Sequence, residues 1–161
     1  MTLKIGYISG PFVGNATKAN LKEAIEKNIE TAKKYAEVLA NNKIGFFVPH
    51  INSVELNGKD LNEKQRFYYE QDTEFLIRAA DFLVAIPGWE TSFGARHEIK
   101  IAEELKLPVF YPQSPDDISE ILEWHKTVKE NNDKLESTLK GNVNWGNVIS
   151  IREKLAKWKF A

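Results

Sequence analysis

Short apolar segments alternate with longer helical segments over the first 112 residues, and this alternation constrains the fold more than any other feature. Each apolar segment is apolar throughout, without the alternation of apolar and polar residues that marks a half-exposed strand. Strands of this kind are buried on both faces, as in a parallel sheet that helices cover on each side. The predicted strands lie at residues 3–9, 43–50, 81–89 and 107–112.

Segments with helical spacing of apolar residues connect these strands. They lie at residues 21–39, 62–80 and 93–105. The sequence therefore predicts an α/β fold with a parallel sheet of four to five strands and helices on both faces. Two further helices are expected at residues 114–133 and 145–161. With 161 residues the chain is expected to form one domain, with a core over residues 1–119 and a helical extension over residues 120–161.

Composition excludes several classes of function. The net charge of -1 argues against a surface built for nucleic acid, and no apolar run reaches the length of a membrane span. The amino-terminal residues lack the pattern of a signal peptide, so we expect a cytoplasmic protein. There is no cysteine, and the three histidines show no zinc-binding spacing. Because the glycines form neither a dinucleotide-binding fingerprint nor a Walker loop, we expect no metal and no cofactor.

Two carboxylates fall on helix faces that are otherwise apolar. Glu98 lies four residues before Ala102 and seven before Leu105, so it shares their face. Asp72 lies four residues before Leu76 on the preceding helix. Burying an unpaired carboxylate is costly, so each is either satisfied by a structural partner or used in chemistry. Two of them near strand-end loops favour an acid–base pair, in which one carboxyl attacks as an anion and the other donates a proton.

The loop ahead of Glu98 has the features of an anion site. Ser92 is expected to cap the helix, and Gly94 is expected to let the backbone approach a ligand. The free N–H groups and the positive end of the helix favour an anion there. Glycine turns of this kind are often only turns, but this one is followed closely by Glu98.

Ligands of open α/β sheets bind beyond the carboxyl ends of the strands. Four further residues at strand ends are therefore expected to line the same site. They are Ser9, Gly10, His50 and Trp89. For His50 the simpler interpretation is a loop histidine without a task, and for Trp89 it is a packed tryptophan instead of one that stacks on a base.

Four stretches of the chain carry a resemblance to a known family. They are YISGP, EQDTEFL, ADFLVAIPGWETSFGARHE and VFYPQS, which begin at residues 7, 70, 80 and 109. Over residues 4–119 the chain resembles the nucleoside 2-deoxyribosyltransferase superfamily. It resembles most closely the 2′-deoxynucleoside 5′-monophosphate N-glycosidases and allied bacterial and phage proteins. The resemblance implies a flavodoxin-like three-layer sandwich and a homodimer, or a higher homo-oligomer, with a shared active site.

The resemblance also implies roles for particular residues. Glu98 would be the nucleophile that attacks the anomeric carbon, and Asp72 would protonate the departing base. Tyr7 would orient the nucleophile and crowd the 2′ position of the sugar. Ser119 would reach into the site of a partner subunit.

By the same resemblance, Ser92 and Gly94 would hold a 5′-phosphate. A serine suits a phosphate because a carboxylate in its place would repel the dianion. The related monophosphate hydrolases carry a basic residue soon after the glycine of the first strand, but here the first basic residue is Lys18. Lys18, Arg96 or a partner chain would have to supply the positive charge.

The favoured interpretation is an N-glycosidase that splits a (deoxy)nucleoside 5′-monophosphate into base and sugar phosphate. Its oxocarbenium-like transition state can be trapped by a carboxylate, as in retaining glycosidases. One alternative is a deoxyribosyltransferase, which passes the sugar to another base. A second alternative is a nucleotide-binding module without catalysis.

Overall fold

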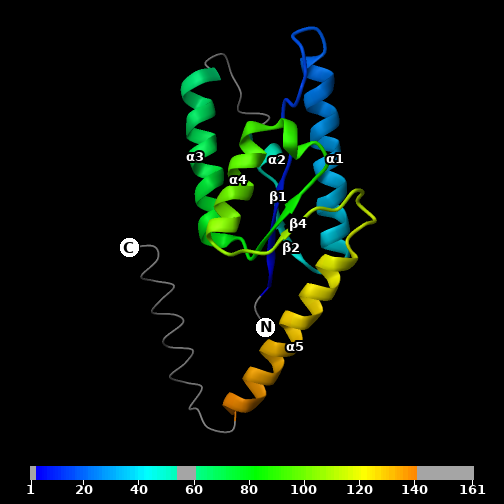
Figure 1. Ribbon diagram of the computed structural model, residues 1–161, viewed down its shortest axis with the longest axis vertical. Helices are drawn as coiled ribbons and strands as arrows, with labels where there is room; N and C mark the ends of the chain where they lie inside the picture. Colours follow the sequence, from blue (N-terminus) through cyan, green and yellow to red (C-terminus); the bar gives the residue numbers. More distant parts are fainter. Residues whose placement is uncertain (1–2, 54–60, 141–161) are drawn as a thin grey trace. The chain divides into compact units, whose positions relative to one another are not determined.

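The structure is a computed structural model that describes residues 3–53 and 61–140 (Figure 1). Contacts within the chain divide it into two compact units, and the boundary between them follows Ile121. The elements are β1 (Ile5–Ser9), α1 (Leu21–Asn41), β2 (Gly45–Phe47), α2 (Pro49–Ser53), α3 (Leu61–Ala79), β3 (Phe82–Ala85), the 3-10 helix η1 (Trp89–Thr91), α4 (Phe93–Glu104), β4 (Val109–Phe110) and α5 (Ser119–Lys140).

The four strands form one parallel sheet in the order β2-β1-β3-β4. This is the order of the first four strands of the flavodoxin-like fold, and it confirms the predicted fold class. In the register of β1 and β3, Tyr7 lies opposite Leu83. The Asp81 carboxylate fixes the amino end of this pair by accepting hydrogen bonds from the Ile5 amide at 2.9 Å and from Lys4 Nζ at 2.8 Å.

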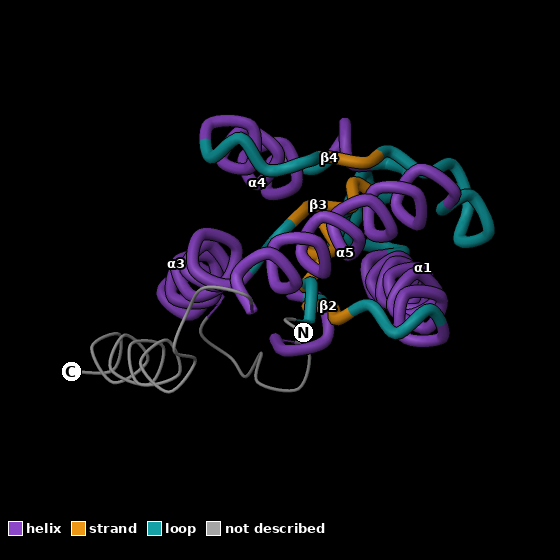
Figure 2. The backbone as a smooth tube through the Cα atoms, turned by 90° about the horizontal axis from the view of Figure 1, so that it is seen from below, coloured by secondary structure: helices purple, strands orange, loops and turns teal. Residues whose placement is uncertain are grey.

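Helices cover both faces of the sheet. Figure 2 shows α1 on one side of the strands and α3 and α4 on the other. Side chains alternate between the two faces along each strand. Tyr7 and Leu83 pack with Leu76 of α3 and with Ile99 and Ala102 of α4, and all five are buried.

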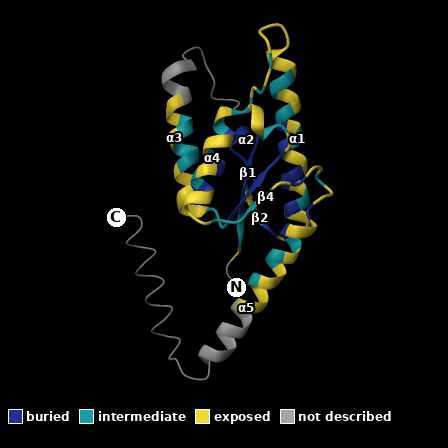
Figure 3. Cartoon of the chain, in the orientation of Figure 1, coloured by how far each residue is buried: buried dark blue, intermediate teal, exposed yellow. Residues whose placement is uncertain are grey.

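The central strands β1 and β3 are the best buried part of their unit, as Figure 3 shows for β1. Along β1 and β3, every second side chain points away from α4 to the opposite face of the sheet. Helix α1 covers that face, and its buried residues include Ala32, Ala36 and Leu39. Residues at the ends of β1 and β3 are therefore held on a rigid base, and their side chains are sorted to one face or the other.

All four strands are shorter than predicted, and β4 keeps only Val109–Phe110 of the predicted residues 107–112. The predicted strand at residues 43–50 ends at Phe47, because Pro49 has no N–H for the sheet and instead begins α2. The predicted strand at residues 81–89 ends at Ala85, and Trp89 begins η1. The helix expected at residues 145–161 lies outside the described residues. Within residues 3–53 and 61–140, no helix has the length and apolarity needed to cross a bilayer.

Candidate active site

The Glu98 carboxylate accepts hydrogen bonds on both of its oxygens. The Tyr7 hydroxyl donates to Oε1 at 2.9 Å, and the Ser9 hydroxyl donates to Oε2 at 2.5 Å. Tyr7 and Ser9 are two residues apart on β1, so both side chains project to the face that α4 covers. Both are fully buried. Two strand hydroxyls thus fix one helix carboxylate in position and orientation.

Glu98 reaches this position because it lies on the buried face of α4. Ala95, Ile99 and Ala102 are the buried residues of that helix. The sequence analysis also placed Leu105 on this face, but Leu105 follows the last helical residue and is exposed. The carboxylate therefore points at the sheet among small and apolar side chains, as predicted, although the face ends earlier than expected.

Burial raises the pKa of Glu98 from 4.5 to about 7. The hydrogen bonds from Ser9 and Tyr7 oppose this rise because they favour the charged form, and the nearby charge of Asp72 adds to it. Burial and the charges of Glu98 and Asp72 also raise the pKa of the Tyr7 hydroxyl well above its usual range. The Tyr7 hydroxyl is therefore protonated at neutral pH and can donate its hydrogen bond to Glu98.

Asp72 is the second carboxyl of the cluster. It lies on α3 one turn before the buried Leu76 and is partly exposed. Burial raises its pKa from 3.8 to about 6. Its charge acts on both Glu98 and Tyr7, so the structure brings together the three residues expected to be catalytic. Burial thus raises the pKa of both carboxyls toward neutral pH, so that either one can carry a proton there.

The amino end of α4 lies beside this cluster. The Ser92 hydroxyl accepts a hydrogen bond from the Ala95 amide at 3.2 Å, which confirms the predicted helix cap. In any helix the first amides have no acceptor within it, which here applies to Phe93 and Gly94. These N–H groups and the helix dipole favour an anionic ligand at this point.

The space next to Gly94 is occupied by the ring of Tyr69, from α3. A Cβ atom placed on Gly94 would lie 3.3 Å from the Tyr69 Cε2 atom and 3.6 Å from its hydroxyl oxygen. Gly94 therefore makes room for the Tyr69 side chain, and the predicted approach of a ligand to the backbone at this glycine stays a prediction. Tyr69 is not among the residues that the sequence predicts for the site. Its position three residues before Asp72 nevertheless places both on one face of α3.

His50 and Gly10 form a second, structural cluster at the end of β1. His50 is buried and lies in α2, and its Nε2 lies 3.1 Å from the Gly10 carbonyl oxygen, to which it donates. Burial lowers the pKa of His50, which favours a neutral ring. His50 thus lies in a helix and not in a loop, and its ring holds the loop after β1, while its expected place in the substrate site stays a prediction. Gly10 is required here because a Cβ would lie 2.3 Å from Ile86 Cγ1.

Other residues expected at the site have different surroundings. Trp89 packs against the core and against Tyr111, with ring centroids 5.4 Å apart, as the packed alternative predicted. Ser119 is exposed at the start of α5. Lys18 is exposed in the loop after β1, and the Arg96 guanidinium donates to the Glu90 carbonyl.

A cavity of about 500 Å³ opens at the same end of the sheet. The loops after β1 and β3 line it together with α1, through residues such as Pro11, Lys27 and Gly88. Its described lining does not include Glu98 or Asp72, so it is distinct from the carboxylate cluster. In the part of the chain that the structure describes, no group of histidine and acidic side chains is arranged to hold a metal ion.

Comparison with curated proteins finds no match to this chain. A family model described as a domain of unknown function, DUF4406, matches residues 4–111. The matched segment runs from β1 to the end of β4 and includes Tyr7, Asp72, Ser92, Gly94 and Glu98, but not Ser119. The chain therefore belongs to the DUF4406 family.

Proposed function

We propose that this protein is an N-glycosidase that hydrolyses the base–sugar bond of a (deoxy)nucleoside 5′-monophosphate. The observation that carries the proposal is the Glu98 carboxylate, which Tyr7 and Ser9 hold on both oxygens within reach of the charge of Asp72. A structural carboxylate would be expected to pair with a cation. This one is instead positioned by two neutral hydroxyls beside a second acid, an arrangement typical of a reactive group.

In the first step a Glu98 oxygen attacks the anomeric carbon, and the bond from that carbon to the base nitrogen breaks. Asp72 gives its proton to the departing base, which leaves a glycosyl ester on Glu98. In the second step the Asp72 carboxylate takes a proton from water, and the resulting hydroxide oxygen attacks the same carbon. Sugar phosphate leaves, Glu98 is again a carboxylate, and Asp72 is again protonated. The two roles match those of the two carboxyls in retaining glycosidases.

The reactive form has the proton on Asp72 and the charge on Glu98. Burial raises the pKa of Glu98 to about 7, above the value of about 6 for Asp72, so of the two one-proton forms this is the less populated fraction. The hydrogen bonds from Ser9 and Tyr7 keep this fraction from being smaller, since they lower the pKa of Glu98. The hydroxyls of Ser9 and Tyr7 thus favour the charged form of the nucleophile and also orient it.

The resemblance supports a phosphorylated substrate through Ser92. The first amides of α4 would donate hydrogen bonds to a 5′-phosphate, and the neutral Ser92 side chain would not repel it. The positive charge that usually accompanies a phosphate would come from Lys18, from Arg96 or from a second copy of the chain in a homo-oligomer with a shared site.

The proposal is tested by incubating the protein with nucleosides and their 5′-monophosphates and detecting free base. Wild type is expected to release base from at least one deoxynucleoside monophosphate, whereas Glu98→Gln should reduce the rate by at least about a thousandfold, since removal of a nucleophile costs factors of this size. Glu103→Gln, which changes an exposed carboxylate on the same helix, should match wild type. Full turnover by Glu98→Gln would contradict the assignment.

The same incubation separates the two alternative functions. An added acceptor base that ends up in a new nucleoside would identify a deoxyribosyltransferase. Tight nucleotide binding with no release of base would identify a binding module.

A further inference from the structure

The Tyr69 hydroxyl is buried without a hydrogen-bond partner among the described residues. It belongs to α3, yet it lies beside the amino end of α4, where Gly94 leaves room for its ring. A Cβ on Gly94 would be 3.6 Å from this hydroxyl and 3.8 Å from Ser92 Oγ, so the two oxygens border the same small space. A buried hydroxyl without a partner costs stability, and most folded proteins avoid it.

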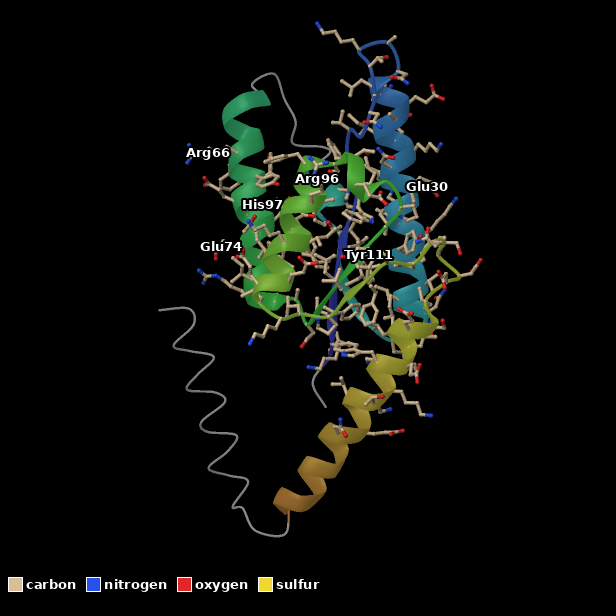
Figure 4. All side chains as sticks on the ribbon, in the orientation of Figure 1. Glu30, Arg66, Glu74, Arg96, His97 and Tyr111 are labelled. Atoms are coloured by element: carbon tan, nitrogen blue, oxygen red, sulfur yellow. The ribbon has the colours of Figure 1, made fainter. Side chains whose placement is uncertain are left out.

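Neighbouring rings hold the hydroxyl in this position. The Tyr69 ring contacts the His97 ring at a centroid distance of 5.8 Å, and His97 stacks on Phe93 at 6.5 Å. Figure 4 shows His97 on the side of α4 that faces α3. The tyrosine is therefore packed between the two helices, and its oxygen is aimed at the start of α4.

The groups already present do not use this donor. Both oxygens of Glu98 accept hydrogen bonds from other hydroxyls, and Ser92 Oγ accepts from the Ala95 amide. Burial and the charge of Glu98 raise the pKa of Tyr69 to about 12, so the group stays protonated and remains able to donate. An oxygen-rich ligand at the amino end of α4 would provide the missing acceptor.

We propose that the Tyr69 hydroxyl donates a hydrogen bond to the 5′-phosphate of the ligand and so selects phosphorylated over free nucleosides. This inference rests on the proposed function for the identity of the ligand, but its geometry depends only on Tyr69, Ser92 and Gly94. The hydroxyl adds a side-chain donor to the backbone amides of α4. A phosphate there would accept from the Tyr69 hydroxyl, which has no hydrogen-bond partner in the part of the chain that the structure describes.

The test compares binding in a Glu98→Gln background, which prevents turnover during the measurement. Calorimetric titration with deoxynucleoside 5′-monophosphates, the matching nucleosides and inorganic phosphate is carried out with and without Tyr69→Phe. Loss of a hydrogen bond to a charged group corresponds to a weakening of about 10- to 100-fold in Kd for the monophosphates. The Kd for nucleosides should stay within about twofold.

Tyr35→Phe is the matched control. The Tyr35 hydroxyl is also buried, but it donates to the Pro112 carbonyl at 3.4 Å on the other side of the sheet. Tyr35→Phe should lower the melting temperature and leave every Kd unchanged. Tyr69→Phe should instead leave the melting temperature of the free protein unchanged or raise it, because it removes a hydroxyl that has no partner among residues 3–53 and 61–140.

Equal weakening for nucleosides and monophosphates, or no weakening for either, would overturn the role of Tyr69. Failure of the proposed function is seen separately, as absence of base release by wild type. A further outcome is that inorganic phosphate binds in a Tyr69-dependent manner while nucleotides do not bind. That result would support Tyr69 as a hydrogen-bond donor to an anion and would contradict a nucleotide as the ligand. If no phosphate-bearing probe binds at all, the inference is overturned.

Discussion

The partly buried Glu98 carboxylate should make the stability of this protein depend on pH in a direction that one substitution can reverse. In the folded protein its pKa is raised from 4.5 to about 7. A group with a raised folded pKa destabilises the fold as pH rises, because the unfolded chain releases its proton more readily. The loss begins near pH 4.5 and is complete above pH 7.

The magnitude follows from the shift. Each pKa unit corresponds to about 1.36 kcal/mol, so the shift of Glu98 amounts to about 3 kcal/mol as an upper bound. Glu98→Gln keeps the shape and removes the charge. Its amide can accept from one of the two hydroxyls and donate to the other, and the altered hydrogen bonds should cost about 1 kcal/mol at every pH.

The expected result is a change of sign. At pH 4 Glu98→Gln should be less stable than wild type by about 1 kcal/mol, and at pH 8.5 it should be more stable by about 2 kcal/mol. Urea denaturation followed by circular dichroism at several pH values measures both free energies of unfolding. Glu103→Gln, an exposed change on the same helix, is the control and should show no such crossing. A stability difference between Glu98→Gln and wild type that stays constant from pH 4 to 8.5 would refute the conclusion that burial raises the pKa of Glu98.

Three further predictions follow from the site. The rate of base release should show a bell-shaped pH profile with limbs near pH 6 and 7, because the active form carries one proton on the pair of Asp72 and Glu98; a profile that is flat from pH 5 to 8 would contradict this. Ser9→Ala should move the alkaline limb to higher pH and lower kcat, since loss of its hydrogen bond raises the pKa of Glu98; an unmoved limb would mean that this hydrogen bond does not poise the carboxylate. Gly10→Ala should destabilise the fold by about 1–3 kcal/mol, because its Cβ would collide with Ile86, and Ile86→Ala should restore part of that loss in the double variant; additive losses in the thermal melts would contradict the contact.

Much of the fold could be predicted because it depends on local pattern. Uniformly apolar segments between helical ones require a parallel sheet covered on both faces, and the observed order β2-β1-β3-β4 fulfils that expectation. The ends of the strands were less predictable. Pro49 and His50 continue an apolar run in the sequence, but they begin a helix once the proline leaves the sheet.

The position of Glu98 was predictable from helical spacing alone, since a carboxylate on an apolar face must meet other groups. Its partners were harder to identify. Tyr7 and Ser9 share a face of β1 by the two-residue period of a strand, but pairing them with Glu98 depends on the packing of α4 against β1. Ser9 was expected to bind substrate, and the structure instead gives its hydroxyl to Glu98.

The hydrogen bonding of Tyr69 and His50 could not be predicted from the sequence. Whether a polar atom finds a partner is decided by contacts between distant segments, such as Tyr69 with Gly94 and His50 with Gly10. A tyrosine on an amphipathic helix looks the same in sequence whether its hydroxyl is solvated, paired or left free. The structure distinguishes these cases.

The central claim is that Glu98 forms a covalent bond to the sugar, and intact-protein mass spectrometry after an acid quench tests it most directly. The protein is mixed with a deoxynucleoside 5′-monophosphate that it cleaves and quenched during turnover. We predict an added mass of one sugar phosphate less one water on the intact protein, located by peptic digestion to the peptide that contains Glu98, and no addition in Glu98→Gln. Release of base at an undiminished rate by Glu98→Gln, with no adduct on either protein, would contradict it.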